Sequence, residues 1–350
     1  MTAPANLFAQ QEANRRRSTW LVGGFLLFFA WVGFGGDIAW YLATADLPAS
    51  EQAHRHTVPF IGIIATLVAG GICLFSWKKG PERVLWATGA KEVFEPANEL
   101  ELRLVNVVEE MAIASGLPKP RIFVVPDPDP NAFATGIVPE KAAVAVTQGL
   151  LQALDRDELQ GVVAHEMAHI QNFDTRLMTL LAAMVGAIAL MSDGMGRMLR
   201  HTSVGRSGGG GGGGGGGKKG GNPLAIIVLV LWVITLILAP VISRFLAMAV
   251  SRKREYLTDA TAAQFTRNPL ALASALEKVD GAAGATRAIA RGAAHLCIVD
   301  PGERRLSAKE GLVGDIFASH PPIQQRVIRL RGMGYAAAKR DAAGASPSSV

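Results

Sequence analysis

The sequence predicts a mainly α-helical fold with a small β-sheet, together with transmembrane helices. Charged residues make up only 18% of the 350 residues, below the usual quarter of soluble domains, while hydrophobic residues reach 49%. Four long apolar stretches interrupt the chain. Between and after them, capped helical patterns prevail over a few short strand-like runs. We therefore expect membrane helices joined to an α+β domain.

The apolar stretches differ in length, and length decides which of them can cross a bilayer. The second has 20 residues, about the length of a span, whereas the third has 15 and is either a short span or a buried core helix. Pro240 interrupts the fourth. Whether the third and the fourth both cross is left open. The four stretches are 20–42, 58–77, 177–191 and 224–250.

The positive residues indicate how the chain is oriented. Arginines occupy positions 15–17 before the first stretch, and Lys78 and Lys79 follow the second, whereas the loop between the stretches carries one arginine. The N-terminus and everything from Lys78 onward should therefore be cytoplasmic. A signal peptide cleaved near residues 43–45 is the alternative, but the closely following second stretch favours a retained anchor.

Charge and cysteine content exclude other classes of protein. The net charge is +6, and its positive residues cluster at the ends of apolar runs, which indicates contact with a lipid bilayer rather than with nucleic acid. The two cysteines, Cys73 and Cys297, lie far apart in the sequence, so a disulfide framework is not expected.

Residues 208–217 are ten consecutive glycines. Such a run has no side chains to bury, and it predicts a flexible tether between the third and fourth stretches. A phosphate-binding loop is the alternative, but it needs a Gly-Lys-Ser/Thr ending that feeds a helix, which this run lacks.

These features divide the chain into five parts. They are a membrane anchor with two transmembrane helices at 1–80, a first soluble part at 81–175, the third and fourth stretches with their glycine loop at 176–250, a helical second part at 251–332, and a disordered tail at 333–350.

The first soluble part combines capped helices with short strands. Asn98 can cap a helix with Glu101 three residues later, and Gly116 ends that helix. Thr147 opens a further short helix. Strands are predicted for RIFVV at 121–125, NAFATG at 131–136 and AAVAVT at 142–147.

The next helix carries the pattern that points to chemistry. Asp155 and Glu158 form its capping box, and the stretch GVVAHEMAHIQN follows. On a helix, His165 and His169 project from one face and can bind one metal ion. Glu166 can reach a water molecule on that ion and act as a general base. Surface histidines are the alternative, but the surrounding residues are apolar, and burying these side chains without a ligand would cost several kcal/mol.

A catalytic zinc ion needs a third protein ligand and an open position. Glu255 is the candidate, with Asp259 one helical turn later as the acceptor for a histidine N–H. Both could equally be ordinary acids on a helix surface, and their spacing alone does not decide between these readings. If the third and fourth stretches cross together or not at all, Glu255 and the histidines lie on the same side of the membrane.

Five separated motifs together resemble the HtpX-like membrane zinc metalloproteases, a family related to the CAAX prenyl endopeptidases. The match covers roughly residues 95–330 and the two N-terminal spans. It implies a gluzincin-type protease domain with one Zn²⁺ per chain, in which Glu255 is the third ligand and Asp259 supports the site. The motifs are NAFATG, AVAVTQGLL, VVAHEMAHIQN, REYLTDATAA and ASHPPIQQRVIRL.

The same resemblance implies roles for further residues. His320 and Arg326 could stabilise the negative oxygen of a tetrahedral intermediate. Alternatively, the two prolines after His320 merely start a helix, and Arg326 pairs with an acid. An edge strand that holds the substrate backbone would consist of Asn131, Ala132, Phe133 and Ala134.

We therefore expect a multi-pass endopeptidase of the bacterial inner membrane with a cytoplasmic protease domain. By resemblance, its substrates would be membrane or misfolded proteins, in protein quality control and stress response; no oligomeric state is indicated. One alternative is a membrane protein with a structural or regulatory zinc and no hydrolase activity, but Cys297 and His295 lack the spacing of structural ligands. A transporter is the other, but apart from Asp37 the spans carry almost no polar residues.

Overall fold

The structure is a computed structural model of the chain. It describes residues 7–43, 58–180, 227, 230–235, 238, 252–282, 297–298 and 321–344. The chain divides into two compact units, which are described separately. One consists of residues 1–18, 76–182 and 247–350, and the other of residues 19–75 and 183–246.

Two long helices make up most of the described part of the second unit, and both continue into the first. They are α1 (Leu7–Ala43) and α2 (Phe60–Ala87), and both are long and apolar enough to cross a membrane by length and composition. Small residues let them approach closely, since a Cβ atom at Gly33 would lie 2.7 Å from the Cα of Gly62. The carboxylate of Asp37 caps the start of α2, accepting a hydrogen bond of 2.6 Å from the Gly62 N–H. Asp37, an exception in this apolar span, therefore has a structural role.

The third and fourth apolar stretches are described only in part. Residues 174–180 are helical, as are residues 227, 230–235 and 238. The rest of both stretches, and the glycine run at 208–217, lie outside the described residues. The number of spans beyond α1 and α2 therefore stays a prediction.

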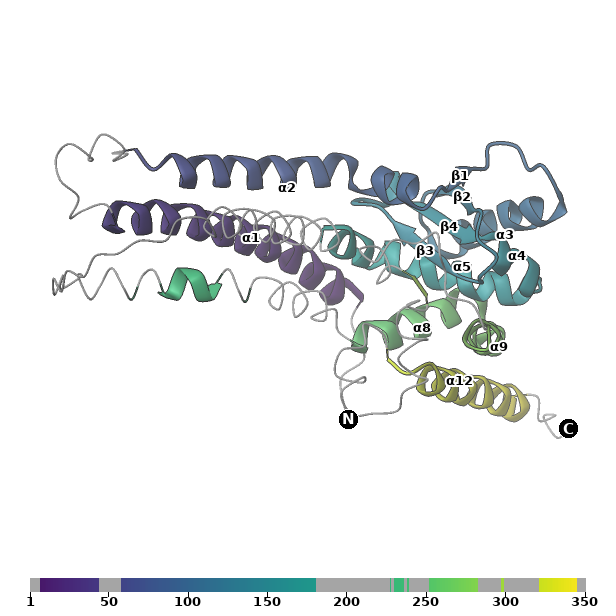
Figure 1. Ribbon diagram of the computed structural model, residues 1–350. Coiled ribbons are helices and arrows are strands. Elements are labelled where there is room, and N and C mark those ends of the chain that lie inside the picture. Colours follow the sequence, from purple (N-terminus) through teal and green to yellow (C-terminus); the bar gives the residue numbers. More distant parts are fainter. Residues whose placement is uncertain are drawn as a thin grey trace, which may run out of the picture. The chain divides into compact units, whose positions relative to one another are not determined.

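The first unit contains a four-stranded mixed sheet with strand order β1-β2-β4-β3 (Figure 1). The pair β2–β4 is parallel, and the pairs β1–β2 and β3–β4 are antiparallel. The strand β3 therefore lies at the edge of the sheet. The strands are β1 (Lys91–Glu92), β2 (Arg121–Val125), β3 (Ala132–Thr135) and β4 (Ala143–Thr147). The last three confirm the predicted strands.

Local capping sets the helix boundaries, as predicted. The side chain of Asn98 accepts a hydrogen bond from the Glu101 N–H, and Gly116 ends the helix in the left-handed region at φ 69°. Asp155 and Glu158 form both hydrogen bonds of a capping box. The helices are α3 (Glu99–Ser115), α4 (Gln148–Ala153) and α5 (Arg156–Gln171).

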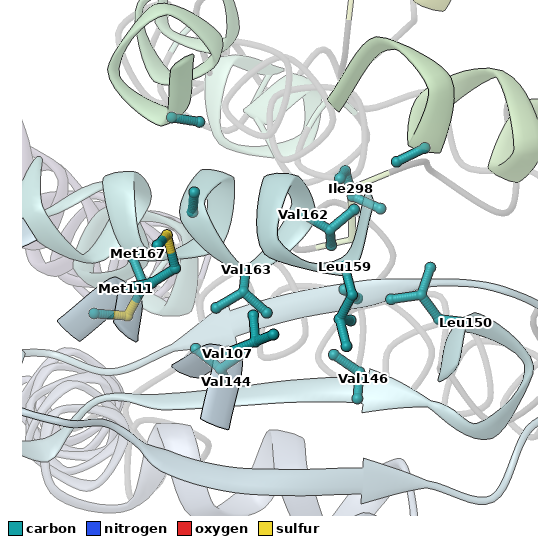
Figure 2. Packing of buried hydrophobic residues seen from close by; sticks show 14 of the residues in the cluster. Val107, Met111, Val144, Val146, Leu150, Leu159, Val162, Val163, Met167 and Ile298 are labelled. Carbon is teal, nitrogen blue, oxygen red and sulfur yellow. The ribbon is translucent and has the colours of Figure 1, made fainter. Parts of the chain in front are cut away.

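The helix α5 lies in the core between the sheet and three further helices. Figure 2 shows Leu159 and Val163 of α5 pointing toward Val144 and Val146 of β4. On another side of α5 a Cβ atom at Gly161 would lie only 2.9 Å from the Leu272 backbone nitrogen, so glycine allows α9 to approach. The three helices are α8 (Arg252–Thr266), α9 (Pro269–Asp280) and α12 (Ile323–Gly344).

The C-terminal helix corrects one expectation. A disordered tail was predicted from residue 333, but α12 continues to Gly344. The segment after Tyr335 is AAAKRDAAG, and alanine, lysine and arginine are among the best helix formers. The low hydrophobicity of this segment therefore does not prevent it from being helical.

Candidate metal centre

The helix α5 brings the two predicted histidines together. Their Nε2 atoms lie 3.1 Å apart, and the two rings are nearly perpendicular, at 88°. The His165 ring is fully buried, while the side chain of His169 keeps 14% of its surface exposed. One helical turn separates the residues, so regular helix geometry alone produces this approach.

The helix α8 supplies the predicted third residue. The Glu255 carboxylate oxygens lie 3.6 Å from Nε2 of His165 and 3.7 Å from Nε2 of His169. One ligand atom from each of the three residues lies within 4.8 Å of the other two. The packing of α8 on α5 thus brings Glu255 next to both histidines, while its role as a metal ligand stays a prediction.

The geometry fits a tetrahedral metal ion. Zinc–nitrogen distances are about 2.0–2.1 Å, so two tetrahedral nitrogen ligands lie roughly 3.3 Å apart, close to the 3.1 Å between the two Nε2 atoms. The contacts of 3.6 and 3.7 Å are made by the two different oxygens of Glu255, one to each histidine. Among the described residues next to the histidines, four carboxylates and two guanidiniums are buried. These residues are Glu166, Asp174, Glu255, Asp259, Arg254 and Arg326.

Asp259 lies where a supporting acid was predicted. Its Oδ1 atom is 3.0 Å from Nδ1 of His165. Burial would raise the pKa of Asp259, but Arg326 and His165 lower it below its ordinary value. Burial lowers the pKa of His165 to about 4.

Asp174 makes the equivalent contact with the second histidine, and our interpretation of the sequence missed it. Its Oδ2 atom lies 3.1 Å from Nδ1 of His169, and Arg254 lies 3.3 Å from its Oδ1. Burial opposes protonation of His169, but Asp174 and Glu255 raise its pKa to about 9. The available signal was that two ligating histidines need two acceptors, and Asp174 is the next acid along the chain.

Glu166 points toward the edge strand of the sheet. Its carboxylate accepts a hydrogen bond from the Ala134 backbone, and burial raises its pKa to about 7. Within the described residues, its buried Oε1 atom has no hydrogen-bond partner. A carboxylate oxygen beside two histidines is thus available to a small polar molecule.

The two remaining predicted catalytic residues have different outcomes. Arg326 is fully buried and donates from Nε and Nη2 to the carboxylate of Asp259, at 2.9 and 2.7 Å. The structure thus shows the alternative prediction for Arg326, in which this arginine pairs with an acid. His320 lies outside the described residues, which resume at Pro321. Its role stays a prediction.

The predicted substrate strand lies at the sheet edge, but its outer side is partly occupied. The Ala132 carbonyl accepts a hydrogen bond of 2.9 Å from the Ile298 N–H, and Phe133 forms an antiparallel bridge with Cys297. The Asn131 side chain accepts from the Ala132 N–H at 3.0 Å. A peptide could pair with this edge only after Ile298 moves away.

Comparison with known proteins gives one family. The model of "Peptidase family M48" matches residues 98–334. A "Protease HtpX homolog" of Listeria monocytogenes serotype 4a (strain HCC23) is 40% identical over 331 residues, covering 93% of this chain and 100% of its own. A protein of the same description from Dictyoglomus turgidum is 36% identical over 335 residues, covering 95% and 96%.

Among solved structures, the crystal structure of S. mikatae Ste24p is similar with a TM-score of 0.44 and 18% identity. The similarity covers 93% of this chain and 66% of that one.

Proposed function

Because the chain belongs to peptidase family M48 and is a membrane metalloprotease that acts on proteins or peptides, we propose that its metal is one zinc ion per chain. The proposed ligands are His165, His169 and Glu255. The observation that carries this proposal is the convergence of two imidazole Nε2 atoms and one carboxylate from a different helix. Three protein ligands are the number typical of a catalytic zinc site.

In the proposed hydrolysis, the metal would activate a water molecule and Glu166 would transfer protons. Zinc in this site would act as a Lewis acid and lower the pKa of a bound water to about 7. Glu166 takes a proton from the attacking water and later gives it to the leaving amine. Its Oε1 atom suits this role because it is buried beside the histidines and has no hydrogen-bond partner among the described residues.

Asp259 and Arg326 hold the ligands in place. Asp259 accepts the Nδ1–H of His165, which leaves Nε2 free to bind the metal. Arg326 donates two hydrogen bonds to the carboxylate of Asp259. Its proposed role is therefore to position this acid rather than to contact the substrate. His320 remains our candidate for stabilising the oxyanion.

The substrate would bind as an extended strand along β3. An edge strand can pair with an extended peptide, and Ala132 lies at such an edge; its carbonyl becomes available when Ile298 moves away. Membrane or misfolded proteins would supply extended segments of this kind. The positive residues around the two N-terminal helices support a cytoplasmic site on the bacterial inner membrane.

The test uses the full-length protein in detergent, with zinc analysis and cleavage of unfolded casein. Glu166→Gln should keep about one zinc per chain and lose cleavage by roughly 100-fold or more, since general-base catalysis contributes about 10²–10⁴-fold. Glu109→Gln, an acid exposed on α3, is the matched control and should cleave normally. Cleavage by Glu166→Gln at the wild-type rate would refute the hydrolytic role. A Glu255→Ala variant that keeps full zinc affinity would show a different third ligand.

A further inference from the structure

The N-terminal part of the first membrane helix contacts the region next to the metal site. Residues 11–18 lie in α1 and belong to the same compact unit as α5 and α8. Gln11 donates a hydrogen bond to the Gln171 carbonyl at 2.9 Å, and Asn14 donates to the Asn172 carbonyl at 2.8 Å. Gln171 is the last residue of α5 and Asn172 is its C-cap, so both carbonyls lie shortly after the second histidine.

Asn14 also contacts the acid that supports this histidine. Its Nδ2 atom donates to Oδ1 of Asp174 at 2.7 Å. The other oxygen of Asp174, Oδ2, lies 3.1 Å from Nδ1 of His169. Both carboxylate oxygens are thus engaged, which fixes the plane and the direction of the group. The Asn14 side chain is completely buried, so water does not compete for this contact.

The residue before Asp174 has an unusual backbone. Phe173 has φ 57°, in the left-handed region that residues other than glycine seldom adopt. The Arg15 guanidinium lies over the Phe173 ring, 4.4 Å from its centre. The start of α1 therefore contacts both the strained residue and the acid that follows it.

We propose that Asn14 is a positioning residue for the metal site and acts on His169 through Asp174. This inference rests on the proposed zinc site. A carboxylate held by Asn14 accepts the Nδ1–H of His169, so the Nε2 lone pair points at the metal. The protease site would therefore include the cytoplasmic end of the membrane anchor, and a chain without residues 11–18 would hold zinc weakly.

The test measures zinc affinity of the full-length protein in detergent by competition with a chelator. Asn14→Ala should weaken zinc binding about tenfold, at the lower end of the effects of residues that support a ligand. Asn14→Asp should weaken it more, because it places a second carboxylate against Asp174. In the cobalt-loaded protein, both variants should shift the visible absorption bands, which report ligand geometry. Gln11→Ala is the matched control, since Gln11 donates to the Gln171 carbonyl at the end of α5 and not to Asp174; its zinc affinity and cobalt spectrum should match those of the wild type.

A double-mutant cycle tests the route of the effect. In a protein that already carries Asp174→Ala, the further change Asn14→Ala should alter zinc affinity less than about twofold, because its target is gone. If Asp174→Ala does not fold, Asp174→Asn replaces it. An unchanged affinity in Asn14→Ala, an equal loss in Gln11→Ala, or a full second loss in the double variant would each overturn the inference. A wild-type protein that binds no zinc would overturn the proposed metal site, and this inference with it.

Discussion

Oδ1 of Asp259 lies 3.0 Å from Nδ1 of His165, on the side of the ring opposite the proposed metal ligand Nε2. Asp259 receives two further hydrogen bonds from Arg326, and both side chains are almost completely buried. A buried carboxylate is stable only when its charge is balanced and its oxygens are bonded. The acid, the guanidinium and the imidazole therefore depend on one another.

Arg326→Lys should destabilise the protein although the charge is kept. A lysine ammonium cannot make the two parallel hydrogen bonds to Asp259, and one carboxylate oxygen would lose its donor. We expect a loss of about 2–3 kcal/mol in the free energy of unfolding, measured by thermal unfolding in detergent. Arg331→Lys, a change in an α12 arginine whose ion pair with Glu277 lies at the surface, should stay within about 0.5 kcal/mol. Equal effects of the two substitutions would contradict the buried pairing.

Removing zinc should lower the melting temperature. A ligand that binds only the folded state stabilises it, by about 2.7 kcal/mol when its free concentration is 100 times its dissociation constant. Unfolding curves of zinc-loaded and chelator-treated protein measure this difference. His165→Ala should abolish the difference because it removes a proposed ligand. A variant that is still stabilised by zinc to the wild-type extent would place the ion elsewhere.

Short-range signals in the sequence predicted much of the fold around the site. The caps at Asn98, Thr147 and Asp155 act within three residues, so each was readable without knowledge of the packing. The pair His165 and His169 was predictable for the same reason, since one helical turn suffices to bring the rings together.

Long-range contacts could not be predicted in this way. Glu255 is separated from the histidines by both later apolar stretches, and only the packing of α8 on α5 distinguishes it from a surface acid. Asp174 follows the end of α5, where helical periodicity no longer applies, and it depends on the unusual backbone of Phe173. The contact of Ile298 with the edge strand joins segments more than 160 residues apart.

Peptide binding at the edge strand should expose Cys297. This cysteine is 1% exposed and pairs with Phe133, while the neighbouring Ile298 N–H occupies the Ala132 carbonyl. A peptide that adds to β3 needs that carbonyl, so residues 297–298 must leave it.

Thiol labelling measures this release in protein that carries Glu166→Gln, so that the peptide is not cut. Cys73→Ala removes the other cysteine, which lies in the second unit. An extended peptide should speed the labelling of Cys297 several-fold, whereas the same peptide with N-methylated backbone amides, which cannot pair with a strand, should leave the rate unchanged. Labelling that is equally slow with a bound peptide would mean that the substrate does not use the Ala132 carbonyl. Because the labelling needs no catalysis, it tests substrate pairing independently of the metal.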